Sequence, residues 1–190
     1  LITADGQFSL TRLAPMVPVA EGAEIVVPPA MRATLDLAGT CQWTICGPSQ
    51  LQIQKIMDAT ACTLATPLCK ALVKPVAQGG SLNIVTPAGS ATLKFEDTTS
   101  MAAVEVAYRP VASGLVTDTQ AYKPVLIVVA VAGEVLVEVL DQAQPQTLIL
   151  GDGLALIETT PRRFKLGEIP TWYRGSSERP KHCAPKSPCL

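Results

Sequence analysis

The stretch "VLIVVAVAGEVLVEVL", residues 125–140, is the most apolar part of the chain and constrains its fold most strongly. Its unbroken part, residues 125–132, has eight residues, whereas a helix that crosses a bilayer needs about 20. Five of the eight are valine or isoleucine, which favour strands. Gly133 and Glu134 then interrupt the run. We predict two consecutive buried strands joined by a tight bend, with a helix as the alternative.

Two similar segments give a second indication. "VVPPAMRATLDLAGT" (26–40) and "IVTPAGSATLKFEDT" (84–98) share seven identical residues at a constant offset of 58. A fixed offset is typical of a repeated supersecondary unit, although two copies are also compatible with chance. The shared residues are small or apolar, apart from two threonines. We therefore predict two equivalent rungs of one β architecture, with Pro29 and Pro87 at equivalent positions, and no active site in either copy.

Short runs rich in β-branched residues occupy most of the chain, and Gly, Pro, Asp and Ser separate them. "LQIQKI" and "ATLDL" alternate between apolar and polar residues, which predicts strands with one solvated face. The fold class is therefore all-β, with stacked short strands in a β-solenoid-like or sandwich arrangement, an internal two-fold repeat and an irregular C-terminal tail. The expected strands cover residues 17–27, 33–37, 42–46, 51–56, 82–85, 91–95, 103–108, 125–131, 134–140, 147–150 and 154–158.

Composition limits the classes of partner. The chain is 48% hydrophobic and 16% charged, which is ample for a core and leaves few charges for the surface. Its 15 Lys and Arg against 16 Asp and Glu give no electrostatic case for binding nucleic acid. The first residue, Leu1, fits a mature chain without its signal peptide, or a trimmed one. We expect an extracellular or cell-envelope location and no membrane span in the mature chain.

The chain has six cysteines, and in an oxidising compartment an even number usually forms disulfides. On one strand, Cys41 and Cys46 would lie roughly 16 Å apart on opposite faces, too far to bond each other. The segments between Cys62 and Cys69 and after Cys183 contain prolines and could close locally as loops. Pairing of these loops with the first two cysteines, or between chains, is the alternative. The disulfide candidates are Cys41, Cys46, Cys62, Cys69, Cys183 and Cys189.

We divide the chain into an N-terminal extension (1–15) that could donate a strand, a β domain (16–160) and a Pro- and Cys-rich tail (161–190). The tail is basic and has little periodicity, so it would not build a core alone. It could be held by a disulfide, bind a partner or be disordered. The candidate contact residues are Leu1, Ile2, Phe8, Leu10, Trp172 and Tyr173.

The order of motifs in residues 16–160 resembles a FecR-type domain. "VPVAEGAEIVVPPAMRATLDLAGTCQWTICGPSQLQI" is followed by "GGSLNIVTPAGSATLKFEDT", "VVAVAGEVLVEVL" and "TLILGDGLALIE". The resemblance implies a stacked, β-solenoid-like extracytoplasmic domain used for contacts. The chain departs from the family at "FEDTT", where many members have a glycine-threonine step. It also lacks the sigma-factor-binding segment and transmembrane helix of the family's iron-transport regulators, so a signalling role is not carried over.

No residue set in the sequence requires catalysis, a metal or a cofactor. His182 lies beside Cys183, but structural zinc sites usually draw on two paired clusters such as C-x₂₋₄-C, whereas the spacings here are C-x₄-C, C-x₆-C and C-x₅-C. A proline-rich tail is also a poor place for a Cys nucleophile. Glu134 and Glu138 could flank a glycosidic bond but are more typical of a solvated strand face. Asp152 in "LGDGLALI" could bind calcium, yet no other acidic cluster is near it in sequence, which favours a turn.

Our first functional hypothesis is a noncatalytic, self-associating structural subunit of the cell surface, a disulfide-stabilised filament or sheath protein that binds copies of itself. Its basis is low charge, an apolar surplus, cysteines and short strands whose edges could pair between chains. The alternative is a periplasmic or surface FecR-like sensor or ligand-binding module. A carbohydrate-active enzyme that uses Glu134 and Glu138 is the third and weakest hypothesis.

Overall fold

The computed structural model describes residues 2–4, 7–9, 18–37, 39–58, 61–110, 122–140, 142, 144–157 and 159–166. These residues form strands and turns, so the all-β prediction is confirmed. Within the same ranges, no helix is long and apolar enough to cross a membrane. The strands are β1 (Ile2–Ala4), β2 (Gln7–Ser9), β3 (Glu24–Val27), β4 (Arg32–Leu37), β5 (Cys41–Asp58), β6 (Ala61–Pro75), β7 (Ser81–Thr86), β8 (Gly89–Phe95), β9 (Met101–Pro110), β10 (Tyr122–Ala132), β11 (Glu134–Val139), β12 (Gln146–Ile149), β13 (Asp152–Ile157) and β14 (Thr160–Lys165).

Two long strands, β5 and β6, organise the sheet. They pair with each other in antiparallel fashion, with several register shifts. The first half of β5 pairs with β4 and the second half with β3. The first half of β6 pairs with β7, and the second half with β9. Because each long strand has different neighbours along its two halves, the sheet divides into two branches.

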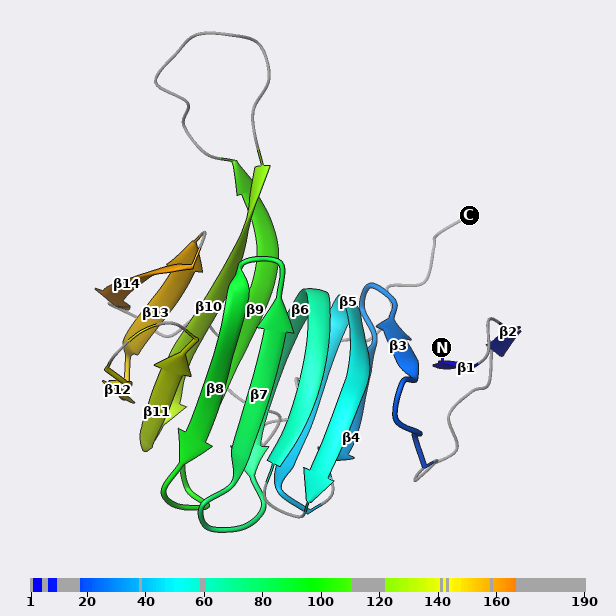
Figure 1. Cartoon of the computed structure of the whole chain (residues 1–190), viewed down its shortest axis with the longest axis horizontal. Coiled ribbons are helices and arrows are strands. Elements are labelled where there is room, and N and C mark those ends of the chain that lie inside the picture. Colours follow the sequence, from blue (N-terminus) through cyan, green and yellow to red (C-terminus); the bar gives the residue numbers. More distant parts are fainter. Residues whose placement is uncertain are drawn as a thin grey trace, which may run out of the picture.

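The branches curl toward each other as two layers (Figure 1). We call β7, β8, β11 and β12 the front layer, and β9, β10, β13 and β14 the back layer. The pair β6–β7 is parallel and the other pairs are antiparallel, so the sheet is mixed. Apolar side chains of both layers join one core, in which Leu93 and Val137 of the front layer lie in the same cluster as Val104 and Val128 of the back layer.

Alternation along the strands produces this core. On β7, buried and half-buried residues alternate without interruption, as expected for a strand with one face in the core. The predicted pair of strands in residues 125–140 is also confirmed, as β10 and β11 separated by Gly133. Gly133 has φ +58°, and a Cβ there would lie 2.8 Å from the Ser100 Cα. Only glycine fits this bend without strain.

The departure from the FecR pattern at "FEDTT" forms a turn of its own. The Asp97 carboxylate accepts hydrogen bonds from the backbone N–H groups of Thr99 and Ser100 and from both hydroxyls. These bonds, with those from Thr99 foremost, lower the pKa of Asp97. The Ser100 hydroxyl in turn accepts a bond from the Glu134 N–H at 3.2 Å. The segment therefore joins the β8–β9 turn to the bend before β11.

The prediction that Cys62 and Cys69 flank a loop was wrong, because residues 61–75 form β6, at the centre of the sheet. Pro67 misled the prediction, since proline cannot donate a ladder hydrogen bond and usually ends a central strand. Here the register shifts between the pairs Gln50–Leu68 and Gln52–Ala65, so Pro67 lies at an irregularity. The separately predicted strands 42–46 and 51–56 also merge, into β5.

The two copies of the sequence repeat adopt different pairings, so they are not equivalent rungs. In the second copy, β7 and β8 form a hairpin around Pro87 and Ala88. In the first copy, β3 and β4 do not pair with each other and instead lie one after the other along β5. Gly47 of β5 lies beside residues 28–31, which connect the two strands along this edge, and its N–H donates to the Met31 carbonyl at 2.9 Å.

Both ends of the described β structure differ from the sequence-based boundaries. Of the predicted strand 17–27, residues 24–27 are strand, and residues 18–23 are not. At the other end, β14 extends the sheet to Lys165, five residues into the predicted tail that starts at Pro161. In the N-terminal extension, which we expected to donate a strand, the backbone of β1 pairs with β3 of its own chain.

Candidate binding groove

A polar row crosses the outer surface of the front layer. Thr63, Asn83, Thr92 and Glu138 come from β6, β7, β8 and β11, and the strand register places each opposite the next. The Asn83 Nδ2 donates to Thr63 Oγ1 at 3.3 Å, and the Thr92 hydroxyl donates to Asn83 Oδ1 at 2.5 Å. These bonds hold the Asn83 amide in one orientation.

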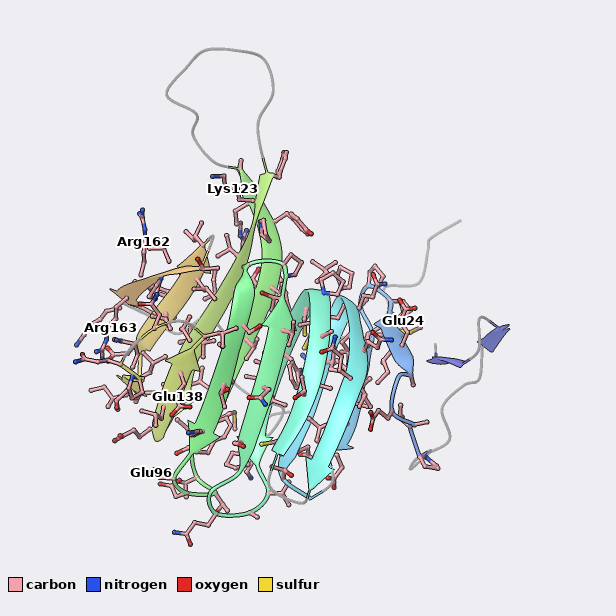
Figure 2. All side chains as sticks on the ribbon, viewed as in Figure 1. Glu24, Glu96, Lys123, Glu138, Arg162 and Arg163 are labelled. Carbon is pink, nitrogen blue, oxygen red and sulfur yellow. The ribbon has the colours of Figure 1, made fainter. Side chains whose placement is uncertain are left out.

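The carboxylate of Glu138 ends this row and pairs with Lys94 at 2.6 Å. Figure 2 shows Glu138 on the outer side of the front layer. Both side chains are more than a third exposed, so water screens the pair and its contribution to stability is at most about 1 kcal/mol. The pair matters more for position, because it directs the carboxylate of Glu138 along the sheet toward β8.

Apolar residues form the other end of the groove. Val85, Leu140 and Pro145 line it beside the polar row, and the whole groove encloses about 640 Å³. Leu140 is 64% exposed. Its N–H donates to the Ser90 carbonyl at 3.0 Å, and the Gln142 N–H donates to the Val139 carbonyl at 3.1 Å. These bonds hold the chain after β11 against β8, where it forms a wall of the groove.

The groove therefore presents hydroxyl, amide and carboxylate groups next to apolar side chains. Its polar side chains offer both donors and acceptors, and its one carboxylate is already paired. In the part of the chain that the structure describes, no three His, Cys, Asp or Glu residues come close enough together to hold a metal ion. The arrangement suits recognition by hydrogen bonds and packing.

The sequence drew attention to Glu134 and Glu138 as a carboxylate pair, and the structure places both on the outer face of β11. Four residues of strand separate their Cα atoms by about 13 Å. The carboxyl groups of a glycosidase pair lie about 5 to 9.5 Å apart, so both side chains would have to lean toward each other along the strand, whereas the Glu138 carboxylate is paired with Lys94 of β8. Glu138 lines the groove, whereas Glu134 is exposed and lies outside its lining. The geometry favours a solvated face.

Asp152, the calcium candidate, is instead part of a structural ion pair. Its side chain is 3% exposed and lies 2.6 Å from Arg163 and 3.7 Å from Lys165, both on the neighbouring strand β14. The hydrogen bond from Arg163 is the largest cause of the lowered pKa of Asp152. The residue follows a turn at Leu150 and Gly151, as the alternative interpretation expected.

The predicted disulfides are not found among the cysteines whose side chains the structure describes. Cys41, Cys46 and Cys69 are all thiols. Cys41 and Cys46 do lie on one strand, as expected. Lys70 is opposite Cys46, so the preceding residue, Cys69, points to the other face, into the core. Burial raises the pKa of the Cys69 thiol to about 12, against smaller opposing effects led by a hydrogen bond with Ser49.

Several predicted residues lie outside the described side chains, and their contacts stay predictions. They are Leu1, Ile2, Phe8, Leu10, Cys62, Trp172, Tyr173, His182, Cys183 and Cys189.

The groove residues Thr63, Asn83 and Thr92 were not predicted as site residues from the sequence. Thr92 was noticed in the repeat, but its counterpart Thr34 lies on β4, opposite Thr44, and has no equivalent row. An outward polar residue on an alternating strand looks the same in sequence whether it lines a groove or faces bulk water. The register between strands, which the sequence did not reveal, brings these residues together.

Comparison with known proteins supports the fold. No protein-family model matches the sequence, and no curated protein matches it. Two crystal structures of a "putative anti-sigma factor" from Parabacteroides distasonis have a similar backbone, with a TM-score of 0.50 and 13% sequence identity over 76% of this chain. The chain spans 59% of that protein's chain. The likeness therefore concerns the fold, and it covers part of the Parabacteroides protein.

Proposed function

We propose that this chain is a FecR-like extracytoplasmic binding module, noncatalytic, which takes its ligand or partner in the front-layer groove. The observation that carries the proposal is the backbone similarity to the Parabacteroides protein over 76% of the chain, which agrees with the FecR-like order of motifs. The groove adds a site whose polar side chains are held in one orientation by hydrogen bonds to one another. The external location and the absence of catalysis are parts of the proposal.

The charged edges of the sheet favour a binding module over a self-associating subunit. β14 has β13 as its paired strand and carries Arg162, Arg163 and Lys165. Figure 2 shows Arg162 and Arg163 at this edge. β4, which pairs with β5, presents exposed Arg32 and Asp36. Charged residues on edge strands oppose the addition of another chain's strand. Self-association into a filament stays a prediction, and the fold similarity does not add to it.

A photo-crosslinking residue placed at position 92 tests the proposal in the envelope of the native cell. The matched control is position 34, the repeat counterpart of Thr92, which lies on β4 outside the groove. We expect a discrete product from position 92 that contains a different molecule, and no such product from position 34. Mass spectrometry identifies the attached species.

Two results would contradict the proposal. A product from position 92 that contains only a second copy of this chain would support the self-associating subunit instead. Equal labelling from positions 92 and 34 would show that the groove has no special role in binding. Asn83→Leu in the same background should weaken the specific product, because it removes both groups that bond Thr63 and Thr92.

A further inference from the structure

Strand β12 is the free edge of the front layer. Within the described chain it pairs with β11 alone. Its four residues, "QTLI", carry no charge, whereas the edge strands β4 and β14 carry charged residues, which oppose the addition of another strand. Ile149 and the following Leu150 are 52% and 61% exposed. By composition, β12 is therefore the edge among these three that is best suited to pair with another chain.

The backbone of β12 presents hydrogen-bonding groups on its free side. In an antiparallel pair, residues bonded to the partner strand alternate with residues whose N–H and C=O groups point away from it. The Arg163 Nη2 of β14 donates to the Thr147 carbonyl at 2.8 Å, so Thr147 is of the second kind. Ile149, two residues further on, is then of the same kind. An added strand would bond to these outward groups.

Asp152 supplies an acceptor at this edge, next to the donor from Arg163. The hydrogen bond from Arg163, at 2.6 Å, is the main cause of the lowered pKa of Asp152, and a bond from the Ile149 N–H adds to it. Arg163 thus satisfies the carbonyl of Thr147, and Asp152 satisfies the N–H of Ile149. Together the two side chains make bonds that a neighbouring strand would otherwise make.

The back layer fixes this pair in place. Asp152 begins β13 and lies opposite Lys165 of β14. The preceding Gly151 donates its N–H to the Ala130 carbonyl of β10 at 2.9 Å, which attaches the turn between β12 and β13 to the back layer. The Asp152 side chain is 3% exposed, with Lys165 at 3.7 Å as a second cation. A buried carboxylate needs such partners, so Arg163 is held over the edge of β12.

We propose that the Asp152–Arg163 pair is a plug on the free edge of β12, and that a second copy of this chain pairs its own β12 with this edge when the plug is removed. A second copy fits because its β12 has the same uncharged sequence and exposed apolar residues, so the two edges match about a two-fold axis. This inference concerns the edge beyond β11 and does not depend on the proposed function.

Analytical ultracentrifugation of the full chain over a range of concentrations tests the plug. Arg163→Ala frees the Thr147 carbonyl and should raise the association constant of the dimer by roughly tenfold or more, the scale of one or two recovered backbone hydrogen bonds. The matched control is Arg162→Ala, which removes the same charge from the same strand. Arg162 alternates with Arg163 and so points to the other face of β14. This control should associate no more than the wild type.

A charge placed on β12 locates the contact. Ile149→Lys, at an exposed position, should return the Arg163→Ala variant to the monomer, because a lysine on an edge strand opposes pairing. Association that persists with the lysine would place the contact elsewhere and overturn the proposal. Equal association of the wild type, Arg162→Ala and Arg163→Ala would overturn it as well, whether all three are dimers or all three are monomers.

Hydrogen exchange of the unmodified chain decides the matter if Arg163→Ala prevents folding. An edge N–H that points to water exchanges at nearly the rate of an unfolded peptide, whereas a bonded N–H is protected. We expect the Ile149 N–H to exchange many-fold more slowly than in the isolated peptide 144–152, because Asp152 accepts its bond. Exchange of Ile149 at the rate of the peptide would show that the edge is not plugged.

Discussion

Gly47 is the position at which a single methyl group should disrupt the in-line pairing of β3 and β4 along one edge of β5. A Cβ at residue 47 would lie 1.8 Å from the Pro28 carbonyl oxygen and 2.7 Å from the Val27 carbonyl oxygen. Both contacts are with backbone, so no side-chain rotation relieves them. Reaching even 3.0 Å from the Pro28 oxygen requires a displacement of 1.2 Å.

The cost follows from what that displacement breaks. The Gly47 N–H bond to the Met31 carbonyl, now 2.9 Å, would lengthen beyond hydrogen-bonding distance, and the neighbouring β3–β5 pairs would shift with it. Each lost bond costs about 1 kcal/mol. Ile25 and Val27, 2% and 4% exposed, would lose part of their burial, which is worth about 1.5–3 kcal/mol per side chain. We expect Gly47→Ala to lower the free energy of unfolding by about 3–5 kcal/mol.

Urea unfolding followed by circular dichroism measures this change. The control is Gly79→Ala, where φ is +74° and nothing lies within 4 Å of the added Cβ. That substitution should cost about 1–2 kcal/mol, the penalty of a left-handed conformation alone. If Gly47→Ala costs no more than Gly79→Ala, the close approach of residues 27–28 to Gly47 of β5 is wrong.

Three further predictions concern the core, an ion pair and a thiol. Leu93→Ala, at a fully buried position, should cost about 2–5 kcal/mol in the same urea experiment. Asp152 has a lowered pKa, so its stabilising contribution is present above its unfolded pKa and is lost as pH falls through the folded pKa. The urea midpoint of Asp152→Asn should therefore fall less than that of the wild type between pH 5 and pH 3, at about the range of carboxyl titration. Cys69, with its pKa raised to about 12, should resist thiol reagents at about pH 8 until the chain unfolds, whereas half-buried Cys46 should react faster than Cys69 in site-resolved mass spectrometry.

Each of these has a clear contrary outcome. A change of a few tenths of a kcal/mol for Leu93→Ala would place β8 outside the core. Identical acid profiles for Asp152→Asn and the wild type would show that the ion pair with Arg163 does not contribute to the loss of stability at low pH. Native labelling of Cys69 as fast as Cys46 would show that β6 is not buried between β5 and β9.

Local pattern predicted the strands that have one face in the core. Short apolar and β-branched runs bounded by turn residues predicted strands at 82–85 and 91–95, within β7 and β8, and the structure buries Ile84 and Leu93 completely. The bend at Gly133 was likewise predictable, because a glycine between two valine-rich runs indicates a turn in a conformation that other residues rarely adopt. These features depend on residues that are neighbours in the chain.

Features set by distant partners were not predictable. Pro67 concealed β6 because its irregularity is accommodated by a register shift against Gln50 and Gln52, residues of another strand. The cysteine count suggested disulfides, but Cys46 and Cys69 point to opposite sides of the sheet. The groove row depends on the registers of β6, β7, β8 and β11 together.

By itself, the sequence determined that this protein is all-β and which face of most strands is apolar, since both follow from residue type and a period of two. Tertiary structure alone decided what each strand pairs with. The two repeat copies make the difference plain: similar residues form a hairpin at Pro87 and an in-line pair of strands at Pro29. The physical reason is that backbone hydrogen bonds can be satisfied by any available strand, and in the first copy β5 is the partner of both strands.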